Sequence, residues 1–212
     1  TLVVSLGSWL AITFSIMALA VGGVTGLGAV VLRTLMALLH NVLFLGEFSF
    51  YYDANVLTPE SPWGIGIILV PVIGGLATVF LVRRFAPEAK GHGVPEVMNA
   101  IYYHEGRIRP MVVVIKALAS AISIGSGAAV GREGPIIQIG SAIGSSIGQF
   151  CRLSNWQLIT LVAAGAGAGI AATFNTPLGG LMFAVELMLP EVSVRTFLPV
   201  VLATGTATYI GR

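Results

Sequence analysis

The first 32 residues of this chain contain no charged side chain. Arg33 is the first charge, and the apolar pattern continues to Leu39. A helix of about 35 residues is ~50 Å long, whereas the hydrocarbon core of a bilayer is only ~30 Å thick. The segment therefore predicts a membrane helix that is either long and tilted or broken near Gly22 and Gly23.

The whole chain is equally poor in charge. Of 212 residues, 11 are basic and 9 acidic, which makes 9% charged, while 56% are hydrophobic and 27 are glycine. Soluble domains carry about 25% charged residues. This composition excludes a soluble enzyme and a disordered segment. The net charge of +2 is too small and too dispersed to hold a polyanion, so no nucleic-acid partner is expected. The sequence predicts an integral membrane protein whose lipid bilayer is its main partner.

Further apolar runs follow the first one. Residues 63–82 are a second spanning candidate. Residues 111–130 are a third apolar run, which is interrupted by Lys116. Four shorter runs of about 12–15 residues, too short to cross a bilayer upright, come next: 136–150, 158–172, 178–189 and 197–210. Such runs predict half-helices that end inside the membrane, where they line a cavity or aim helix ends at an ion. Re-entrant packing with no ion is the alternative. The predicted fold class is an all-α, polytopic membrane protein with tilted and broken re-entrant helices.

The charges indicate the orientation. Residues 83–116 carry the six basic side chains Arg83, Arg84, Lys90, Arg107, Arg109 and Lys116. The connection 40–62 has turn residues such as Pro59 and the acids Glu47, Asp53 and Glu60, with no Lys or Arg. The positive-inside rule places 83–116 on the cytoplasmic side and 40–62 outside.

Glycines recur at four-residue spacing. Gly22 and Gly26, then Gly140 and Gly144, and later Gly165 and Gly169 follow this pattern. Small residues at this spacing let helix backbones approach closely in lipid. The pattern predicts tight helix packing and carries no function by itself.

Two glycine-rich loops have the chemistry of an anion site. They read GHGVPE at residues 91–96 and GREGP at 131–135, each with a proline placed to open a helix. Glycines leave backbone N–H groups open, and a helix N-terminus adds about half a positive charge. Such a site suits a permeating anion, which must bind and also leave. The candidate anion-binding residues are Gly91, His92, Gly93, Val94, Pro95, Arg132 and Gly134.

Glu133 is itself an anion within this predicted anion site. When ionised, its carboxylate would occupy the site, and when protonated or displaced it would vacate it, which is the behaviour of a gate. The alternative is a helix-capping acid paired with Arg132.

A third motif, FNTPL at residues 174–178, precedes another acid. Asn175 and Thr176 are candidate caps for a new helix, which Pro177 would open. Glu186 follows within an apolar segment. An acid inside a membrane is a functional candidate. The alternative is an acid at the cytoplasmic end that contacts water.

No other chemistry is indicated. The histidines 40, 92 and 104 and the single cysteine, Cys151, do not have the spacing of metal ligands. No Ser/His/Asp constellation is present, so we expect neither a metal, nor a cofactor, nor an enzyme, and the only ligand expected is the transported anion. Because the chain starts at Thr1 rather than Met, we expect that it is trimmed at its N-terminus, and trimming at its C-terminus is left open.

At these residues the chain resembles the CLC family of chloride channels and chloride/proton exchangers, over essentially its whole length. Residues 131–135 match the family's GREGP motif, and 91–96 match its GSGIPE motif with His92 in the serine's place. Residues 174–178 resemble its FNAPL segment, and LVRRFAPE at 81–88 is similar to bacterial members.

The resemblance implies a homodimer with one pore per subunit, each subunit being built from two inverted halves. It makes Glu133 the gating glutamate and places 91–95 at the central and internal anion sites. It implies dimer contacts near residues 176–211 and a multi-pass protein of the plasma (inner) membrane.

Three departures from the family pattern affect the prediction. Residues 1–212 match only the N-terminal half of a CLC transmembrane domain, so the C-terminal half of the pore must come from the rest of the chain or from another chain. His92 replaces the serine hydroxyl that faces the anion, which puts the anion preference in doubt, unless His92 turns away and the backbone binds alone. Leu187 stands where exchangers have an internal proton-carrying glutamate. Glu186 is the neighbouring residue, and on an ideal helix its side chain is turned by about 100° from that of Leu187. It is therefore a candidate for a proton path but cannot simply replace the exchangers' glutamate.

The sequence therefore predicts transmembrane transport of chloride or a similar anion, gated by Glu133. Channel-like uniport is slightly favoured because of Leu187, and chloride/proton antiport is the alternative. From another class, a non-conducting half-length membrane scaffold or partner subunit is a further alternative.

Overall fold

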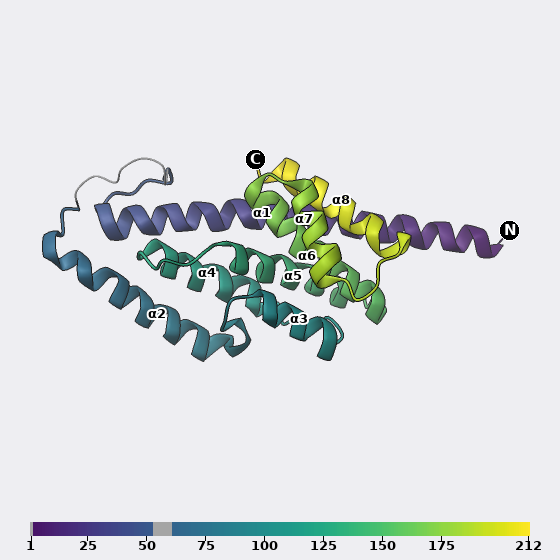
Figure 1. Cartoon of the computed structure of the whole chain (residues 1–212), viewed down its shortest axis with the longest axis horizontal. Coiled ribbons are helices and arrows are strands. Elements are labelled where there is room, and N and C mark those ends of the chain that lie inside the picture. The colour runs from purple at the N-terminus through teal and green to yellow at the C-terminus, as the bar shows by residue number, and fades with distance from the viewer. Residues whose placement is uncertain (1, 53–60) are drawn as a thin grey trace.

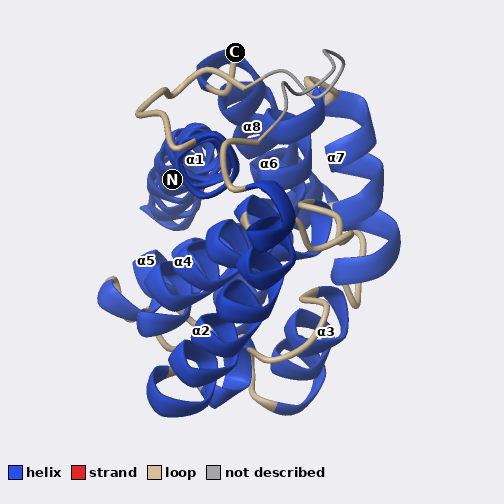
Figure 2. Cartoon of the chain, turned by 90° about the vertical axis from the view of Figure 1, so that its left-hand side faces the viewer, coloured by secondary structure: helices blue, strands red, loops and turns tan. Residues whose placement is uncertain are grey.

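The computed structural model describes residues 2–52 and 61–212, with side chains from Ala11 onward. Within these residues every regular element is helical and no strand occurs (Figure 2). The elements are α1 (Leu2–His40), the π-turn η1 (Asn41–Leu45), the 3-10 turn η2 (Gly64–Ile68), α2 (Leu69–Phe85), the 3-10 turn η3 (Pro87–Ala89), α3 (Val94–Tyr103), α4 (Met111–Gly125), α5 (Glu133–Phe150), α6 (Asn155–Phe174), α7 (Pro177–Phe183), the π-turn η4 (Ala184–Met188) and α8 (Val194–Ile210). The predicted features at Asp53, Pro59 and Glu60 lie outside the described residues.

Helix α1 is continuous through Gly22 and Gly23, which decides between a long helix and a broken one. It runs along most of the length of the molecule (Figure 1). Three helical stretches among the described residues are long and apolar enough to cross a membrane: 11–45, 64–85 and 155–174. The first two of these were predicted as spans.

The third span corrects a prediction. The run 158–172 was expected to be a half-helix, yet α6 has 20 residues. The helix begins earlier because its first turn is polar: the Gln157 carboxamide oxygen accepts a hydrogen bond from the Ser154 N–H at 3.2 Å and caps the N-terminus. The length of an apolar run therefore underestimates the length of a helix whose capping residues are hydrophilic. Helices α7 and α8 do remain short, at 7 and 17 residues.

Helix α6 forms the centre of the fold. It packs on α1, α5, α7 and α8, and nearly all of its residues from Leu158 to Ala172 are buried. At its crossing with α5, Gly140 and Gly165 lie so close that a methyl group on either would overlap the other's carbonyl oxygen. Gly22 of α1 meets the Ala203 backbone of α8 in the same way. The predicted close packing through glycines is confirmed at these crossings.

Helix α2 lies at the edge of the molecule (Figure 1). Its only buried residue is Gly74, which packs against Ser126 just after the end of α4. Its outer face is apolar and exposed, with Leu76 at 68% and Phe80 at 66%. Water would not stabilise such a face, so it requires lipid or another protein surface.

Candidate functional site

The two glycine-rich loops, 40 residues apart in the chain, meet at their glycines. A methyl group on Gly93 would overlap the Gly134 carbonyl oxygen, and a methyl group on Gly134 would overlap the His92 carbonyl oxygen. Gly93 also has φ +111°, a conformation that side chains with a Cβ rarely adopt. The starts of α3 and α5 are thereby brought together, as expected for loops that form one site.

The loop 91–93 is closed by the first acid of α3. The Gly93 N–H donates to Glu96 Oε2 at 2.6 Å, which is the acidic half of a capping box. The same carboxylate lies over Gly91, where a Cβ would overlap Glu96 Oε1. Pro95 stands at the second position of the helix, so the predicted opening of a helix by this proline is confirmed.

Side chains from two other helices anchor the residues before this loop. The Lys116 Nζ of α4 donates to the carbonyl oxygens of Ala89 and Gly91, both at 2.9 Å. The Gln138 Nε2 of α5 donates to the Glu88 carbonyl oxygen at 3.0 Å. Both anchoring side chains are buried, at 4% and 3% exposure. They hold the loop against α4 and α5, because buried carbonyl groups left unpaired would cost free energy.

One cavity of about 580 Å³ is shared by both loops. Gly91 and His92 border it on one side and Gly131 and Pro135 on the other. Its other walls include three basic side chains from outside the loops: Arg83, Lys90 and Lys116. Open glycine backbone together with this positive charge makes the cavity suitable for a small anion.

His92 borders this cavity rather than turning away from it. A Cβ at Gly134 would lie 3.1 Å from His92 Nδ1, so the imidazole ring lies beside the start of α5. The neutral ring can donate one hydrogen bond to an anion and the protonated ring can donate two.

Glu133 is the first residue of α5 and is exposed. Its carboxylate folds back over the preceding loop, where a Cβ at Gly131 would overlap Glu133 Oε2. Gly131 borders the shared cavity, so the carboxylate lies next to it. Glu133 and Glu96 thus each lie over the first glycine of their own loop.

Arg132 does not face the cavity. Its guanidinium carbon lies 5.9 Å above the ring centre of Phe174, at the far end of α6. Ion pairs between described residues join Arg107 to Glu105 and Arg109 to Glu88, and none joins Arg132 to Glu133. The alternative in which Glu133 is a cap paired with Arg132 therefore has no contact to support it.

Glu186 lies apart from the loops, in the π-turn η4, and does not border the shared cavity. The Leu189 N–H donates to the Ala184 carbonyl oxygen at 3.0 Å, five residues back, which widens this turn. The angle of about 100° between Glu186 and Leu187 assumed an α-helix. A π-turn has more residues per turn than an α-helix, so the angle between neighbouring side chains in η4 is somewhat smaller. Both side chains are exposed.

The FNTPL segment differs from its predicted role at Asn175 and at Thr176. Asn175 ends α6 in the left-handed conformation, with φ +56°, and accepts a hydrogen bond from Arg212 Nε at 3.0 Å. Thr176 precedes α7 without a side-chain capping bond, and Pro177 opens that helix as predicted. Asn175 is therefore a C-terminal residue of α6 rather than a cap of the next helix.

Sequence reasoning missed two residues of this site. Lys116 entered only as a marker of orientation, and Glu96 only as the last letter of a motif. A lysine in the middle of an apolar run was the available signal, because a charge there needs buried partners. Among the described residues no cluster of three histidine, cysteine, aspartate or glutamate side chains is placed to hold a metal ion.

Comparison with known proteins identifies the family. Residues 74–212 match the family model described as voltage gated chloride channel. The chain is 36% identical over 179 residues to the H+/Cl− exchange transporter ClcA of Citrobacter koseri, covering 82% of this chain and 36% of that protein. It is 40% identical over 135 residues to ClcA of Vibrio cholerae serotype O1, covering 61% of this chain and 28% of that protein.

Comparison with solved structures leads to the same family. A slow cyanobacterial Cl−/H+ antiporter matches with a TM-score of 0.71 and 28% identity, over 94% of this chain and 46% of that one. A CLC-type fluoride/proton antiporter, at 22% identity and a TM-score of 0.73, shares the fold. The chain belongs to the voltage-gated chloride channel (CLC) family and is an integral membrane protein in a lipid bilayer. It spans about a third of the length of the curated relatives that it matches.

Proposed function

We propose that this chain contributes one half of the pore of a proton-coupled anion exchanger for chloride or a similar small anion. The observation that carries the proposal is the meeting of the loops 91–96 and 131–135 at Gly93 and Gly134, beside a cavity with basic walls. Backbone N–H groups at two helix starts can hold an anion there without an ion pair. The binding then stays weak enough for the anion to leave again.

In this proposal Glu133 is the gate. Its ionised carboxylate lies over Gly131 at the start of α5, where it competes with an anion for the same N–H groups and the same positive potential. Protonation, or displacement by the anion, moves the carboxylate aside. A carboxyl group that alternates between these states can carry a proton in one direction while the anion moves in the other.

The relatives favour exchange over uniport. The two bacterial relatives are named H+/Cl− exchange transporters, and the cyanobacterial structure is an antiporter. The preference for channel-like uniport, which rests on Leu187, finds no support in these names. Uniport stays the second candidate, because Leu187 is apolar and carries no proton. In an exchanger, Glu186 or another group would have to carry the proton instead.

Several features of the assembly belong to the same proposal. The chain would be the N-terminal half of the transmembrane domain, completed by a second half. The whole protein would form a homodimer through surfaces near residues 176–211. Residues 83–116 would face the cytoplasm and the protein would reside in the plasma (inner) membrane.

The test is a flux assay on the full-length protein in liposomes. An outward chloride gradient should drive protons into the vesicles against their own gradient, and the proton and chloride fluxes should keep a constant ratio. Chloride flux without uphill proton movement would replace exchange by uniport. The absence of any anion flux, with the protein correctly inserted, would favour the non-conducting scaffold.

A further inference from the structure

We propose that a cavity between α1, α6 and α8, remote from the anion loops, binds an anionic phospholipid. The cavity has a volume of about 420 Å³ and is bordered by Phe14 of α1, Trp156 and Gln157 of α6, and Arg195, Leu198 and Pro199 of α8. None of these residues borders the cavity shared by the anion loops. The inference therefore does not use the anion loops. Arg195, Leu198 and Pro199 lie within the segment 176–211 of the proposed homodimer, so the lipid site requires that the dimer leave this end of α8 uncovered.

One side of this cavity is apolar. The rings of Phe14 and Trp156 meet edge to face with their centres 5.6 Å apart. Leu198 and Trp156 are 49% and 47% exposed, so a bound apolar group would remove much of their surface from contact with water. A flexible acyl chain fits such a wall because it needs no directional partner.

The other side supplies hydrogen-bond donors and positive charge. Arg195 is exposed, and neither ion pair found among the described residues involves it. The Gln157 Oε1 accepts from the Ser154 Oγ at 2.7 Å, so the amide nitrogen is the remaining polar group of this cavity-lining side chain. A phosphate group pairs well with a guanidinium that has no protein partner.

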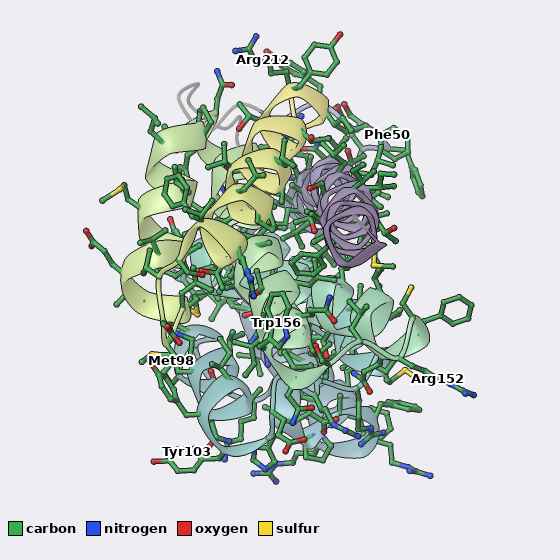
Figure 3. All side chains as sticks on the ribbon, turned by 90° about the vertical axis from the view of Figure 1, so that its right-hand side faces the viewer. Phe50, Met98, Tyr103, Arg152, Trp156 and Arg212 are labelled. Carbon is green, nitrogen blue, oxygen red and sulfur yellow. The ribbon has the colours of Figure 1, made fainter. Side chains whose placement is uncertain are left out.

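The position of the cavity favours a lipid over a soluble anion. Two of the three candidate membrane spans, 11–45 and 155–174, border it. Trp156 is the second residue of α6. Figure 3 shows it near the centre of an end-on view, below α1 and α8, with Arg152 off to one side. Tryptophan and arginine at the end of a spanning helix are typical of the membrane–water interface. There, a single ligand with a charged head and an apolar tail contacts both sides of the cavity.

The experiment uses the tryptophan as its own reporter. In the full-length protein every tryptophan except Trp156 is replaced by phenylalanine, and the protein is placed in vesicles of phosphatidylglycerol and phosphatidylcholine. Bromine is carried on the acyl chains of one lipid or the other, because a brominated chain quenches indole fluorescence on contact. We expect brominated phosphatidylglycerol to occupy the site about fivefold more than brominated phosphatidylcholine does. This is about the preference that one cation beside an anionic headgroup produces.

Two matched variants test the assignment. Arg195→Gln should reduce the preference for phosphatidylglycerol to near unity. Arg152→Gln removes an exposed arginine that does not border the cavity, and should leave the preference unchanged. Equal quenching by the two lipids, or a preference that survives Arg195→Gln, would overturn the proposal. Protection of Trp156 from both lipids would also overturn it, since a second copy or the rest of the chain would then fill the cavity.

Discussion

Gly93 and Gly134 are in backbone contact, and neither position has room for a methyl group. Gly93 ends the loop before α3 and Gly134 lies in the first turn of α5, so this contact sets the distance between two helix starts. A single glycine pair thus joins two motifs that are separate in the sequence.

Replacing Gly93 by alanine should therefore disrupt the site. The new methyl group would overlap the Gly134 carbonyl, and φ +111° would strain the backbone further. We expect a loss of stability of about 1–3 kcal/mol, together with weaker anion binding. Thermal unfolding in detergent and calorimetric anion titration measure the two effects. The control is Gly205→Ala, where no atom lies within 4 Å of the added carbon, and an equal loss there would contradict the argument.

Replacing Glu133 by glutamine tests the gate. The amide mimics the protonated side chain, so anion flux at neutral pH should rise. The wild-type flux should increase as the pH falls, because protonation neutralises the carboxylate, and the variant should lose this dependence. Flux through liposomes between pH 4 and 8 is the measurement. Glu105→Gln alters an exposed acid that pairs with Arg107 at 3.7 Å, and should change neither property.

Lys116 should be needed for the conformation of the loop that begins at Gly91. Lys116→Met keeps the length and apolar stem of the side chain but leaves the carbonyls of Ala89 and Gly91 without their donor. Each buried unpaired group costs about 1–3 kcal/mol, so we expect lower thermal stability and weaker chloride binding. Lys90→Met removes an exposed lysine beside the same cavity and controls for charge alone. If both variants bind chloride equally, the hydrogen bonds of Lys116 do not matter for the site.

His92→Ser should change the order of anion preference. His92 borders the cavity, and a serine hydroxyl is smaller and never cationic. We expect the permeation of nitrate and fluoride relative to chloride to shift. Competitive flux measurements give the series. If the order of anion preference is unchanged, the backbone N–H groups alone determine it.

Glu186→Gln should separate proton movement from anion movement. Glu186 is exposed in η4 and does not border the anion cavity, so anion flux should persist. If Glu186 lies on the proton path, uphill proton transport should fall by about 10²- to 10⁴-fold, the contribution typical of a positioned proton-transfer group. Glu191→Gln alters an exposed acid just beyond the same turn and is the matched control. Full proton coupling in the Glu186 variant would exclude it from the path.

Much of the fold was predictable because membranes impose local rules. The charge-free first segment, the prolines in the first turns of α3 and α7, and the glycine spacing of α5 and α6 each predicted features that the structure contains. These features depend on residues a few positions apart, which hydropathy and backbone chemistry describe well. The one span that was misjudged, α6, begins with residues 155–157, of which Asn155 and Gln157 are polar, so the apolar pattern begins only at Leu158.

Long-range contacts were decided only by the tertiary structure. The sequence by itself determined a membrane protein with two glycine loops suited to an anion and one carboxylate, Glu133, beside them. Packing decided that the loops meet at Gly93 and Gly134, that Lys116 reaches back to Gly91, and that Arg132 turns toward Phe174. The reason is physical: a loop's composition sets which groups it offers, but which groups meet depends on how helices far apart in the chain cross.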